Sequence, residues 1–224
     1  LGLTKAEFVV GSSFQRKLDY IDDILKMSLK TTINRGLRSM QEIARNFEEG
    51  TTKISQIIYP LMQIEDIKAL KVDLAFGGID QRKIHMLGSE MLPLINCKTP
   101  IFLHTPIIPS LKGQGKMSSS QPESLISVTD TESEIHTKIG NAYCTPKDLQ
   151  DNSVLAILKL VIFPRIKEFK VERERKFGGD LVFKNYDEVE KMFVKEKLHA
   201  LDLKKAVSKY LNDILNGGRK IIKT

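Results

Sequence analysis

Two short apolar runs, separated by a segment with helical periodicity, constrain the fold of this chain more than any other feature. The first run, VDLAFGG, covers residues 72–78 and ends in two glycines, and the second, IFLHT, covers residues 101–105. Such runs are typical of strands buried on both faces of a parallel sheet. Residues 79–92 lie between them and have the period of a helix. The alternation predicts an α/β protein with an open parallel sheet.

Apolar residues at three- and four-residue spacing predict further helices on both sides of this unit. Asn34 is a candidate cap for the second of them, and Pro60 is a candidate kink or start for the third. The charged stretch 167–183 turns at Gly178 and Gly179, and we expect it to return as a short strand. The expected helices cover residues 14–33, 35–47, 53–70, 131–142, 152–163, 186–196 and 203–215.

Composition indicates an ordinary globular protein. The chain has 224 residues, of which 41% are hydrophobic and 28% charged, enough for one domain and a smaller second one. No apolar run has the length of a membrane span and the first ten residues do not form a signal peptide, so we expect a cytoplasmic protein without a membrane. Cys97 and Cys144 are expected to be free thiols, although a single disulfide is an alternative.

Charge and histidine spacing bear on partners and metals. The net charge of +7 suits a polyanion such as RNA or DNA, but many proteins are mildly basic. The four histidines are far apart in the sequence and no Cys-x-x-Cys is present, so we expect no tightly bound metal.

The stretch AFGGIDQRK, residues 75–83, has two interpretations. Gly77 and Gly78 lie between a predicted strand and a predicted helix, where open α/β sheets bind ligands. Asp80 could then accept a hydrogen bond from a ribose hydroxyl, and Gln81 could bind an ammonium group. Alternatively, the glycines only permit a tight turn and Asp80 caps the helix.

The stretch YPLMQIED places three polar side chains on one face of a predicted helix. Tyr59, Gln63 and Asp66 lie at positions i, i+4 and i+7. A polar face of this kind could line a cleft for a small polar ligand. A solvated helix face is the alternative interpretation.

The stretch LKGQGKMSSS, residues 111–120, combines spaced glycines with a lysine and three serines. Gly113 and Gly115 would make the loop mobile. Lys116 suits phosphate oxygens, so the loop could close over a triphosphate and stabilise the charge on leaving pyrophosphate. A flexible serine-rich linker is the alternative.

These stretches together resemble a known family. KMSSS resembles the KMSKS-type signature of class I aminoacyl-tRNA synthetases. YPLMQIEDI, GGIDQRKIHML and KFGGDL with LHALDLKKAV are similar to the archaeal and eukaryotic tyrosyl-tRNA synthetases, in order and at similar spacing from about residue 9 to about residue 215. The resemblance implies part of a class I Rossmann-type nucleotide-binding domain followed by a mainly helical anticodon-binding domain.

The resemblance implies that the protein activates tyrosine with ATP and transfers it to tRNA(Tyr). Tyr59, Gln63 and Gln81 would hold the ammonium and carboxylate groups of tyrosine, and Gln15 is a further candidate for this site. Asp66 would accept a hydrogen bond from the phenol and so reject phenylalanine, which would leave the carboxylate unpaired.

The same resemblance implies roles in ATP binding. Gly77, Gly78 and Asp80 would face the ribose. Lys116, with Met117, would bind ATP and the leaving pyrophosphate, while Ser118 and Ser119 hold the loop or a phosphate. No nucleophilic side chain is expected, because activation rests on positioning and charge stabilisation. Mg²⁺ would arrive with ATP.

For tRNA, the resemblance implies anticodon contacts by Phe177, His199 and Asp202. Phe177 would stack on an unpaired base, and Asp202 would accept two hydrogen bonds from guanine. A core position for Phe177 and a helix N-cap for Asp202 are the alternatives. Arg82 and Lys83 would contact the acceptor stem.

The implied organisation has four parts, one of which is interrupted. The helical insertion (19–54) builds a homodimer interface in the family, although its helices also suit ordinary core packing. The parts are the catalytic domain (1–18 and 55–105), the helical insertion (19–54), the KMSSS loop and linker (106–137) and the anticodon-binding domain (138–224).

The chain departs from the family in one respect. It has neither the HIGH-type motif that holds the phosphates of ATP nor the first strand–loop–helix unit with its second contact to the phenol. We expect that an N-terminal part was truncated, is encoded separately or was lost, and the leucine start favours truncation. The isolated chain would then be inactive or impaired. A noncatalytic tRNA-binding or assembly module is the alternative function, and Asp66 argues against a tryptophanyl enzyme.

Overall fold

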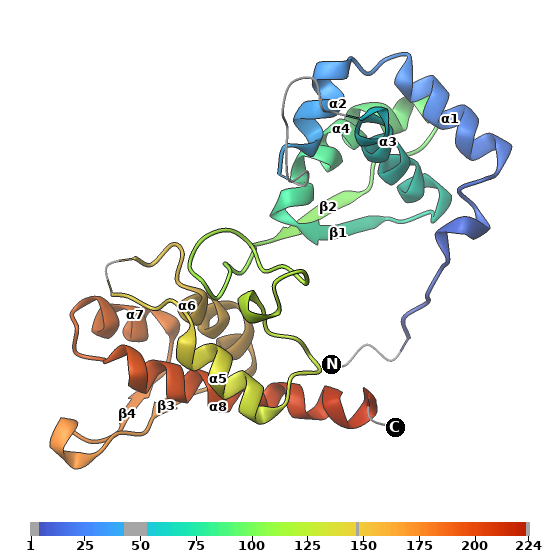
Figure 1. Ribbon diagram of the computed structural model, residues 1–224. Helices are drawn as coiled ribbons and strands as arrows, with labels where there is room; N and C mark the ends of the chain where they lie inside the picture. Colours follow the sequence, from blue (N-terminus) through green and yellow to red (C-terminus); the bar gives the residue numbers. More distant parts are fainter. Residues whose placement is uncertain (1–4, 43–52, 147, 223–224) are drawn as a thin grey trace. The chain divides into compact units, whose positions relative to one another are not determined.

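The computed structural model describes residues 5–42, 53–146 and 148–222, and these residues form two compact units (Figure 1). One is an α/β unit that ends at Ile107, and the other is a mainly helical unit that begins at Ile108.

The α/β unit contains a two-stranded parallel sheet and four α-helices. Strand β1 pairs with β2 from Leu74 opposite Ile101 to Gly78 opposite Thr105, and α4 lies between the strands in the sequence. The prediction of two parallel strands is confirmed, with the bounds of the second as expected. The elements are α1 (Leu18–Ser28), α2 (Ile33–Met40), α3 (Ile54–Ala69), β1 (Leu74–Gly78), α4 (Arg82–Met91) and β2 (Ile101–Thr105).

The helix predictions in this unit hold, with two local corrections. Thr32 caps α2, because its side chain accepts a hydrogen bond from the backbone of Arg35, so Asn34 lies inside the helix rather than at its cap. Helix α3 begins at Ile54, so Pro60 lies within the helix rather than at its start. The predicted residues 43–47 of the second helix lie outside the described residues.

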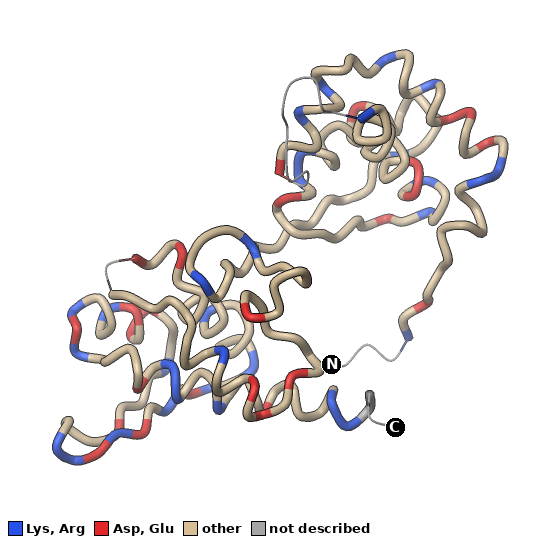
Figure 2. The backbone as a smooth tube through the Cα atoms, viewed as in Figure 1, with Lys and Arg blue, Asp and Glu red and all other residues tan. Residues whose placement is uncertain are grey.

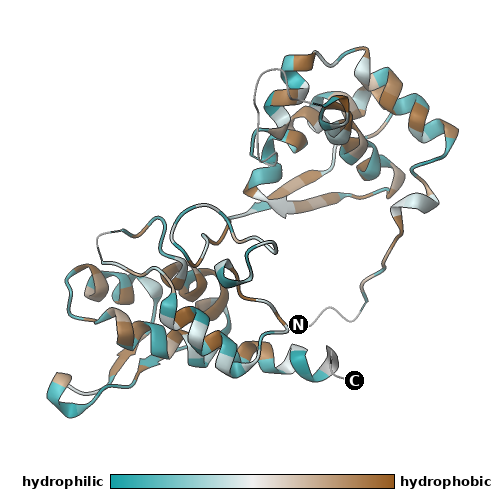
Figure 3. Ribbon diagram, in the orientation of Figure 1, coloured by the Kyte–Doolittle hydropathy of each residue, from teal (hydrophilic) through white to brown (hydrophobic). Residues whose placement is uncertain are grey.

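Only one face of the sheet is covered by the helices of this chain. Ala75 and Phe102 pack against the core of the α/β unit. The opposite face exposes a row of apolar side chains, and Figure 3 colours much of both strands as hydrophobic. The expectation of burial on both faces was therefore wrong for the described residues. The row consists of Leu74, Phe76, Ile101 and Leu103, which are 49%, 64%, 69% and 49% exposed.

The helical unit combines four helices with a short antiparallel hairpin. The helix predictions are confirmed in position, but α8 is longer than expected, since it runs over residues 200–222 rather than 203–215. After α6 the chain continues as a π-helical turn (Leu158–Ile162) and a 3-10 turn (Phe163–Arg165). The elements are α5 (Glu132–Asn141), α6 (Ser153–Ile157), β3 (Phe169–Val171), β4 (Leu181–Phe183), α7 (Tyr186–Val194) and α8 (Ala200–Ile222).

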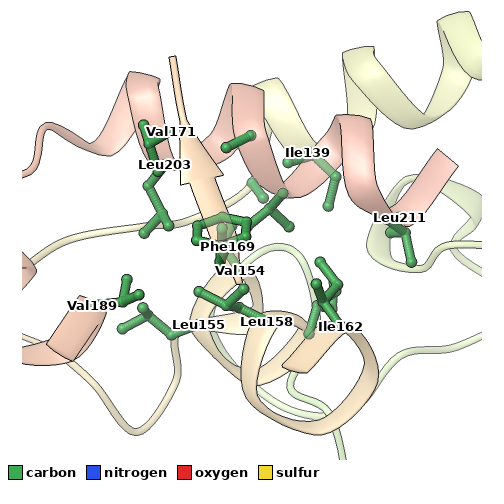
Figure 4. Close-up of a cluster of buried hydrophobic side chains, with 14 of the residues drawn as sticks. Ile139, Val154, Leu155, Leu158, Ile162, Phe169, Val171, Val189, Leu203 and Leu211 are labelled. Carbon is green, nitrogen blue, oxygen red and sulfur yellow. The ribbon is translucent and has the colours of Figure 1, made fainter. Parts of the chain in front are cut away.

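The core of the helical unit forms around Phe169 of strand β3 (Figure 4). Leu155 and Leu158 contribute from the α6 segment and Leu203 from α8, and all of these side chains are fully or almost fully buried. Burying an apolar side chain of this size contributes about 1.5–3 kcal/mol. Leu111, from the glycine-spaced stretch, belongs to the same core and is 2% exposed.

A buried ionic cluster lies beneath α1 and α3. Asp23 is 3% exposed and forms ion pairs with Lys26 and Lys68. Burial opposes its charge, but the two lysines outweigh burial and lower the pKa of Asp23. Glu65 is also 3% exposed, and its Oε2 atom has no hydrogen-bond partner among the described residues. Burial, and then the charge of Asp23, raise the pKa of Glu65 to about 7.

Glu65 predicts a pH-dependent stability. Its folded pKa of about 7 lies above the ordinary value of 4.5. Its contribution to the free energy of unfolding is therefore complete below pH 4.5 and is lost as pH rises through 7. Because each pKa unit corresponds to about 1.4 kcal/mol, Glu65→Gln should remove on the order of 2–3 kcal/mol of this dependence. Urea unfolding, followed by circular dichroism at pH values across this range, measures the pH dependence of the free energy of unfolding. The exposed control Glu7→Gln should keep the wild-type profile, and an unchanged profile in Glu65→Gln would contradict the assignment.

Candidate functional site

The polar face of α3 is organised by the carboxylate of Asp66. Its Oδ1 atom accepts a hydrogen bond from the hydroxyl of Tyr20 at 2.7 Å and another from Nε2 of Gln15 at 3.0 Å. Among the described residues, no hydrogen bond reaches Oδ2. One oxygen is therefore satisfied within the chain, while the other can accept a further donor.

A glutamine pair joins α3 to the end of strand β1. Nε2 of Gln63 donates to Oε1 of Gln81 at 3.1 Å. Oε1 of Gln63 is buried and has no partner among the described residues. Tyr59 lies one turn earlier on α3 and is 50% exposed. A buried acceptor without a partner is costly, so this atom is suited to a ligand that donates a hydrogen bond.

Tyr20 is a residue of this site that the sequence did not reveal. It lies in α1, and its apolar neighbours suggest a core position, which agrees with its 2% exposure. Its hydroxyl donates to Asp66 and also lies 2.9 Å from the carbonyl oxygen of Met62. Burial, and then the contact with Asp66, raise the pKa of Tyr20, so the phenol remains protonated and keeps donating. The only sequence signal is an aromatic residue with a polar tip inside an amphipathic helix.

The two glycines at the end of β1 permit close approach rather than an unusual backbone angle. A Cβ atom on Gly78 would lie 2.6 Å from Oδ1 of Asp80, and one on Gly77 would lie 3.1 Å from Cγ of Gln81. A 3-10 turn (Ile79–Gln81) follows and leads directly into α4. The glycines therefore let the Asp80 and Gln81 side chains fold back over the end of the strand.

Two histidines that are distant in the sequence form a pair behind this turn. Nδ1 of His85 lies 2.9 Å from Nε2 of His104, and the ring of Phe102 stacks on His85. Burial, and then the charge of His104, lower the pKa of His85, which favours its neutral form. The pair ties α4 to β2. The described residues contain no group of three or more side chains suited to holding a metal ion.

The stretch with Lys116 forms a folded loop in the helical unit. We call residues 109–124 the signature loop. Lys116 pairs with Pro109 in an antiparallel bridge. Met117 packs against the core of the helical unit, and the hydroxyls of Ser118 and Ser120 are 2.9 Å apart. Ser119 is exposed.

The anticodon candidates gather at one end of the helical unit. Phe177 is 60% exposed in a 3-10 turn (Arg175–Phe177) between β3 and β4, so the core alternative is wrong for this residue. The side chain of Arg173 donates to the carbonyl oxygens of Gly179 at 3.0 Å and Lys197 at 3.3 Å. It thereby ties the hairpin to the chain just before α8.

The start of α8 carries His199 and Asp202. Nδ1 of His199 accepts a hydrogen bond from the backbone N–H of Leu201 at 3.2 Å. His199 therefore caps the start of α8, which is the role that was the alternative for Asp202. Asp202 lies in the first turn instead, where a negative charge is favourable. Its side chain forms no hydrogen bond or ion pair within the described ranges.

A basic groove of about 380 Å³ lies between α2 and α4. Arg35 is paired with Glu90 in this groove, and Lys83 with Glu42 at 3.0 Å. The side chains of Arg38 and Arg82 form no ion pair with other described residues. Within the described ranges, two guanidinium groups of the groove are therefore without an ion-pair partner. No helix in the described part of the chain has both the length and the apolar character of a membrane span.

Comparison with known proteins identifies the family. The family model of class I tRNA synthetases (W and Y) matches residues 1–216. The tyrosine–tRNA ligase of Methanosarcina mazei is 47% identical over 224 residues, which cover 99% of this chain and 69% of the relative.

Solved structures agree with this match. The tyrosyl-tRNA synthetase of Archaeoglobus fulgidus, crystallised with L-tyrosine, is 49% identical, with a TM-score of 0.86 over 96% of this chain and 66% of that one. The enzyme from Pyrococcus horikoshii, also complexed with L-tyrosine, is 31% identical, with a TM-score of 0.88 over 98% of this chain and 66% of that one. This chain thus spans about two thirds of the length of these relatives. It belongs to the class I aminoacyl-tRNA synthetases and, within them, to the tyrosyl-tRNA synthetase family.

Proposed function

We propose that the protein containing this chain is a tyrosine–tRNA ligase, which forms tyrosyl-adenylate from tyrosine and ATP and transfers the tyrosyl group to tRNA(Tyr). The observation that carries the proposal is the buried Oε1 atom of Gln63, which has no partner among the described residues. An ammonium group supplies the donor that this atom needs. The Archaeoglobus fulgidus relative was crystallised with L-tyrosine, which supports the same ligand here.

In this proposal the two ends of tyrosine contact two parts of α3. Gln63 and Gln81, with Tyr59 nearby, hold the ammonium and carboxylate groups. Oδ2 of Asp66 accepts the hydrogen bond of the phenol, while Tyr20 and Gln15 hold the carboxylate through Oδ1. Phenylalanine would bury the apolar ring but leave Oδ2 without a donor, which costs about 1–3 kcal/mol.

Candidate residues for ATP binding are assigned in each unit separately. The turn after β1 accepts the ribose, with Asp80 as hydrogen-bond acceptor and Gly77 and Gly78 allowing the nucleotide to approach the backbone. Lys116 stabilises the charge that builds up on pyrophosphate as it leaves, assisted by Met117, Ser118 and Ser119 of the signature loop. Members of this family use ATP as substrate. Mg²⁺ arrives with ATP and shields its phosphates.

The helical unit binds the anticodon in this proposal. Phe177 offers an exposed ring for stacking, and Nζ of Lys176 lies 4.9 Å from its centroid. The unpaired carboxylate of Asp202, beside His199, accepts hydrogen bonds from the first anticodon base. Figure 2 shows further basic residues along α8, which suit the RNA backbone. The groove with Arg38, Arg82 and Lys83 suits acceptor-stem phosphates.

Dimerisation and location complete the proposal. Helix α1 and the residue that follows it expose apolar side chains, among them Leu18 and Leu29, which are 83% and 84% exposed. Such a face suits contact with a second copy, so we place the homodimer interface in residues 19–54, of which 43–52 lie outside the described residues. We place the enzyme in the cytoplasm, where tRNA is aminoacylated.

Tyrosine-dependent ATP–pyrophosphate exchange tests the proposal directly. The complete gene product should exchange with tyrosine but not with tryptophan or phenylalanine, and Lys116→Ala should lower the rate about 10²–10³-fold, the effect of losing one preorganised charge-stabilising group. The isolated chain should be much less active. Adding any further segment of the gene product should restore its pyrophosphate exchange. A complete protein that folds and binds tRNA(Tyr) without exchange would instead indicate a noncatalytic tRNA-binding module.

Substrate discrimination depends on Asp66. Asp66→Asn should reduce the preference for tyrosine over phenylalanine about 10- to 100-fold, because the weaker acceptor no longer penalises a missing phenol as strongly. The ratio of kcat/KM values for the two amino acids measures it. Asp73→Asn, an exposed control in the same unit, should leave the ratio unchanged. Equal ratios in wild type and Asp66→Asn would show that Asp66 does not contact the phenol.

Anticodon binding can be tested separately from activation. Phe177→Ala should weaken tRNA(Tyr) binding about 5- to 100-fold through lost stacking, and Asp202→Ala should remove the preference for guanine at the first anticodon base. Filter binding at fixed salt measures both effects, and pyrophosphate exchange should not change. Val182→Ala, an exposed apolar residue of the same hairpin, is the control. Unchanged affinity and base preference would place the anticodon elsewhere.

A further inference from the structure

The signature loop is folded on itself rather than extended. The backbone of Ser110 donates to Gly115 at 3.0 Å, and the backbone of Gly113 donates to Ser110 at 2.9 Å. Gly113 and Gly115 have φ values of 93° and 75°, which disfavour other residues. The glycines therefore build a hairpin with Lys116 on its returning arm.

A buried serine at the end of the signature loop, outside the KMSSS motif, holds this returning arm. Ser124 is 1% exposed, and its hydroxyl donates to the carbonyl oxygen of Gln121 at 2.7 Å. The hydroxyl oxygen of Ser124 also accepts a hydrogen bond from the backbone N–H of Ser118 at 3.2 Å. The carbonyl oxygen of Ser124 accepts from the backbone of Leu111 at 2.9 Å. One residue thus connects both arms of the loop.

The outgoing arm is anchored to the end of α5. Leu111 lies in the core of the helical unit, and its carbonyl oxygen accepts from the backbone of Tyr143 at 2.7 Å. The ring of Tyr143 lies against Gly113, where a Cβ atom would be 2.6 Å from Cδ1. The base of the loop is therefore continuous with the packed helical unit.

We propose that Ser124 is a positioning residue for adenylate formation, acting through the backbone of Ser118 on Lys116. This inference rests on the proposed function, in which Lys116 stabilises the leaving pyrophosphate. A lysine has a flexible four-carbon stem, so the place of its ammonium group depends on where its backbone is held. An error of about 1 Å in such a group can cost about 10²-fold in rate. Tyr143 and Gly113 hold the opposite arm in the same way.

The test compares three variants of the complete gene product. Ser124→Ala should lower kcat for tyrosine-dependent pyrophosphate exchange about 10- to 100-fold, from the loss of hydrogen bonds at a buried site, with KM for tyrosine unchanged. Ser124→Thr keeps the hydroxyl and should remain within about threefold of wild type. Ser133→Ala, the same truncation at an exposed position of α5, should have no effect. Wild-type kcat in Ser124→Ala would overturn the proposal.

A double-mutant cycle distinguishes positioning from general destabilisation. If Ser124 acts through Lys116, adding Ser124→Ala to Lys116→Ala should cause almost no further loss of kcat. Fully additive losses would show that Ser124 acts by another route and would overturn the proposal.

A second variant keeps the inference testable if Ser124→Ala fails to fold. Gly113→Ala forces a side chain against Tyr143 and should give a similar loss of kcat, whereas Gly140→Ala, whose added Cβ meets nothing within 4 Å, should be active. Wild-type kcat in a folded Gly113→Ala would overturn the proposal. Absence of exchange in the unmodified protein would instead refute the proposed function on which it rests.

Discussion

The carboxylate of Asp66 is the constraint on which the arrangement of the α/β unit depends. A partly buried carboxylate must be hydrogen-bonded, because leaving it unsatisfied costs several kcal/mol. Tyr20 from α1 and Gln15 from the segment before α1 both donate to one of its oxygens. The same contacts that hold α1 against α3 therefore leave the second oxygen as an acceptor. The packing of α1 on α3 and the proposed selection of the phenol therefore depend on the same carboxylate.

The glutamine pair extends this organisation to the sheet. Gln63 on α3 donates to Gln81, which lies immediately after β1, so the helix and the end of the strand are linked at the proposed site. The histidine pair fixes α4 to β2 on the other side of the same turn. The turn is thus held at both ends by side chains, while its glycines allow the backbone to be approached closely. This combination suits binding of a nucleotide at a rigid backbone.

Sequence patterns predicted those features of the fold that depend on residues close together in the chain. Strand β2 has its expected bounds, because a short apolar run between polar segments is a local signal. Tyr20 and Asp66 are 46 positions apart, and the two paired histidines 19, so no local pattern connects them. Caps were also missed: Thr32 rather than Asn34 caps α2, because several residue types can supply the acceptor and only the backbone path selects one. The roles of Gln63, Asp66 and Lys116 came from the family resemblance.

The signature loop shows why composition is ambiguous for such segments. Glycines and serines suit a flexible linker, but positive φ values and backbone-to-hydroxyl hydrogen bonds demand the same residues in a tightly folded hairpin. What separates the two cases is the flanking apolar residue. Leu111 is buried in the helical unit, and a linker would gain nothing from burying it. Because the loop with Lys116 is packed onto the unit with Phe177 and Asp202, the proposed contacts with pyrophosphate and with the anticodon belong to one packed unit.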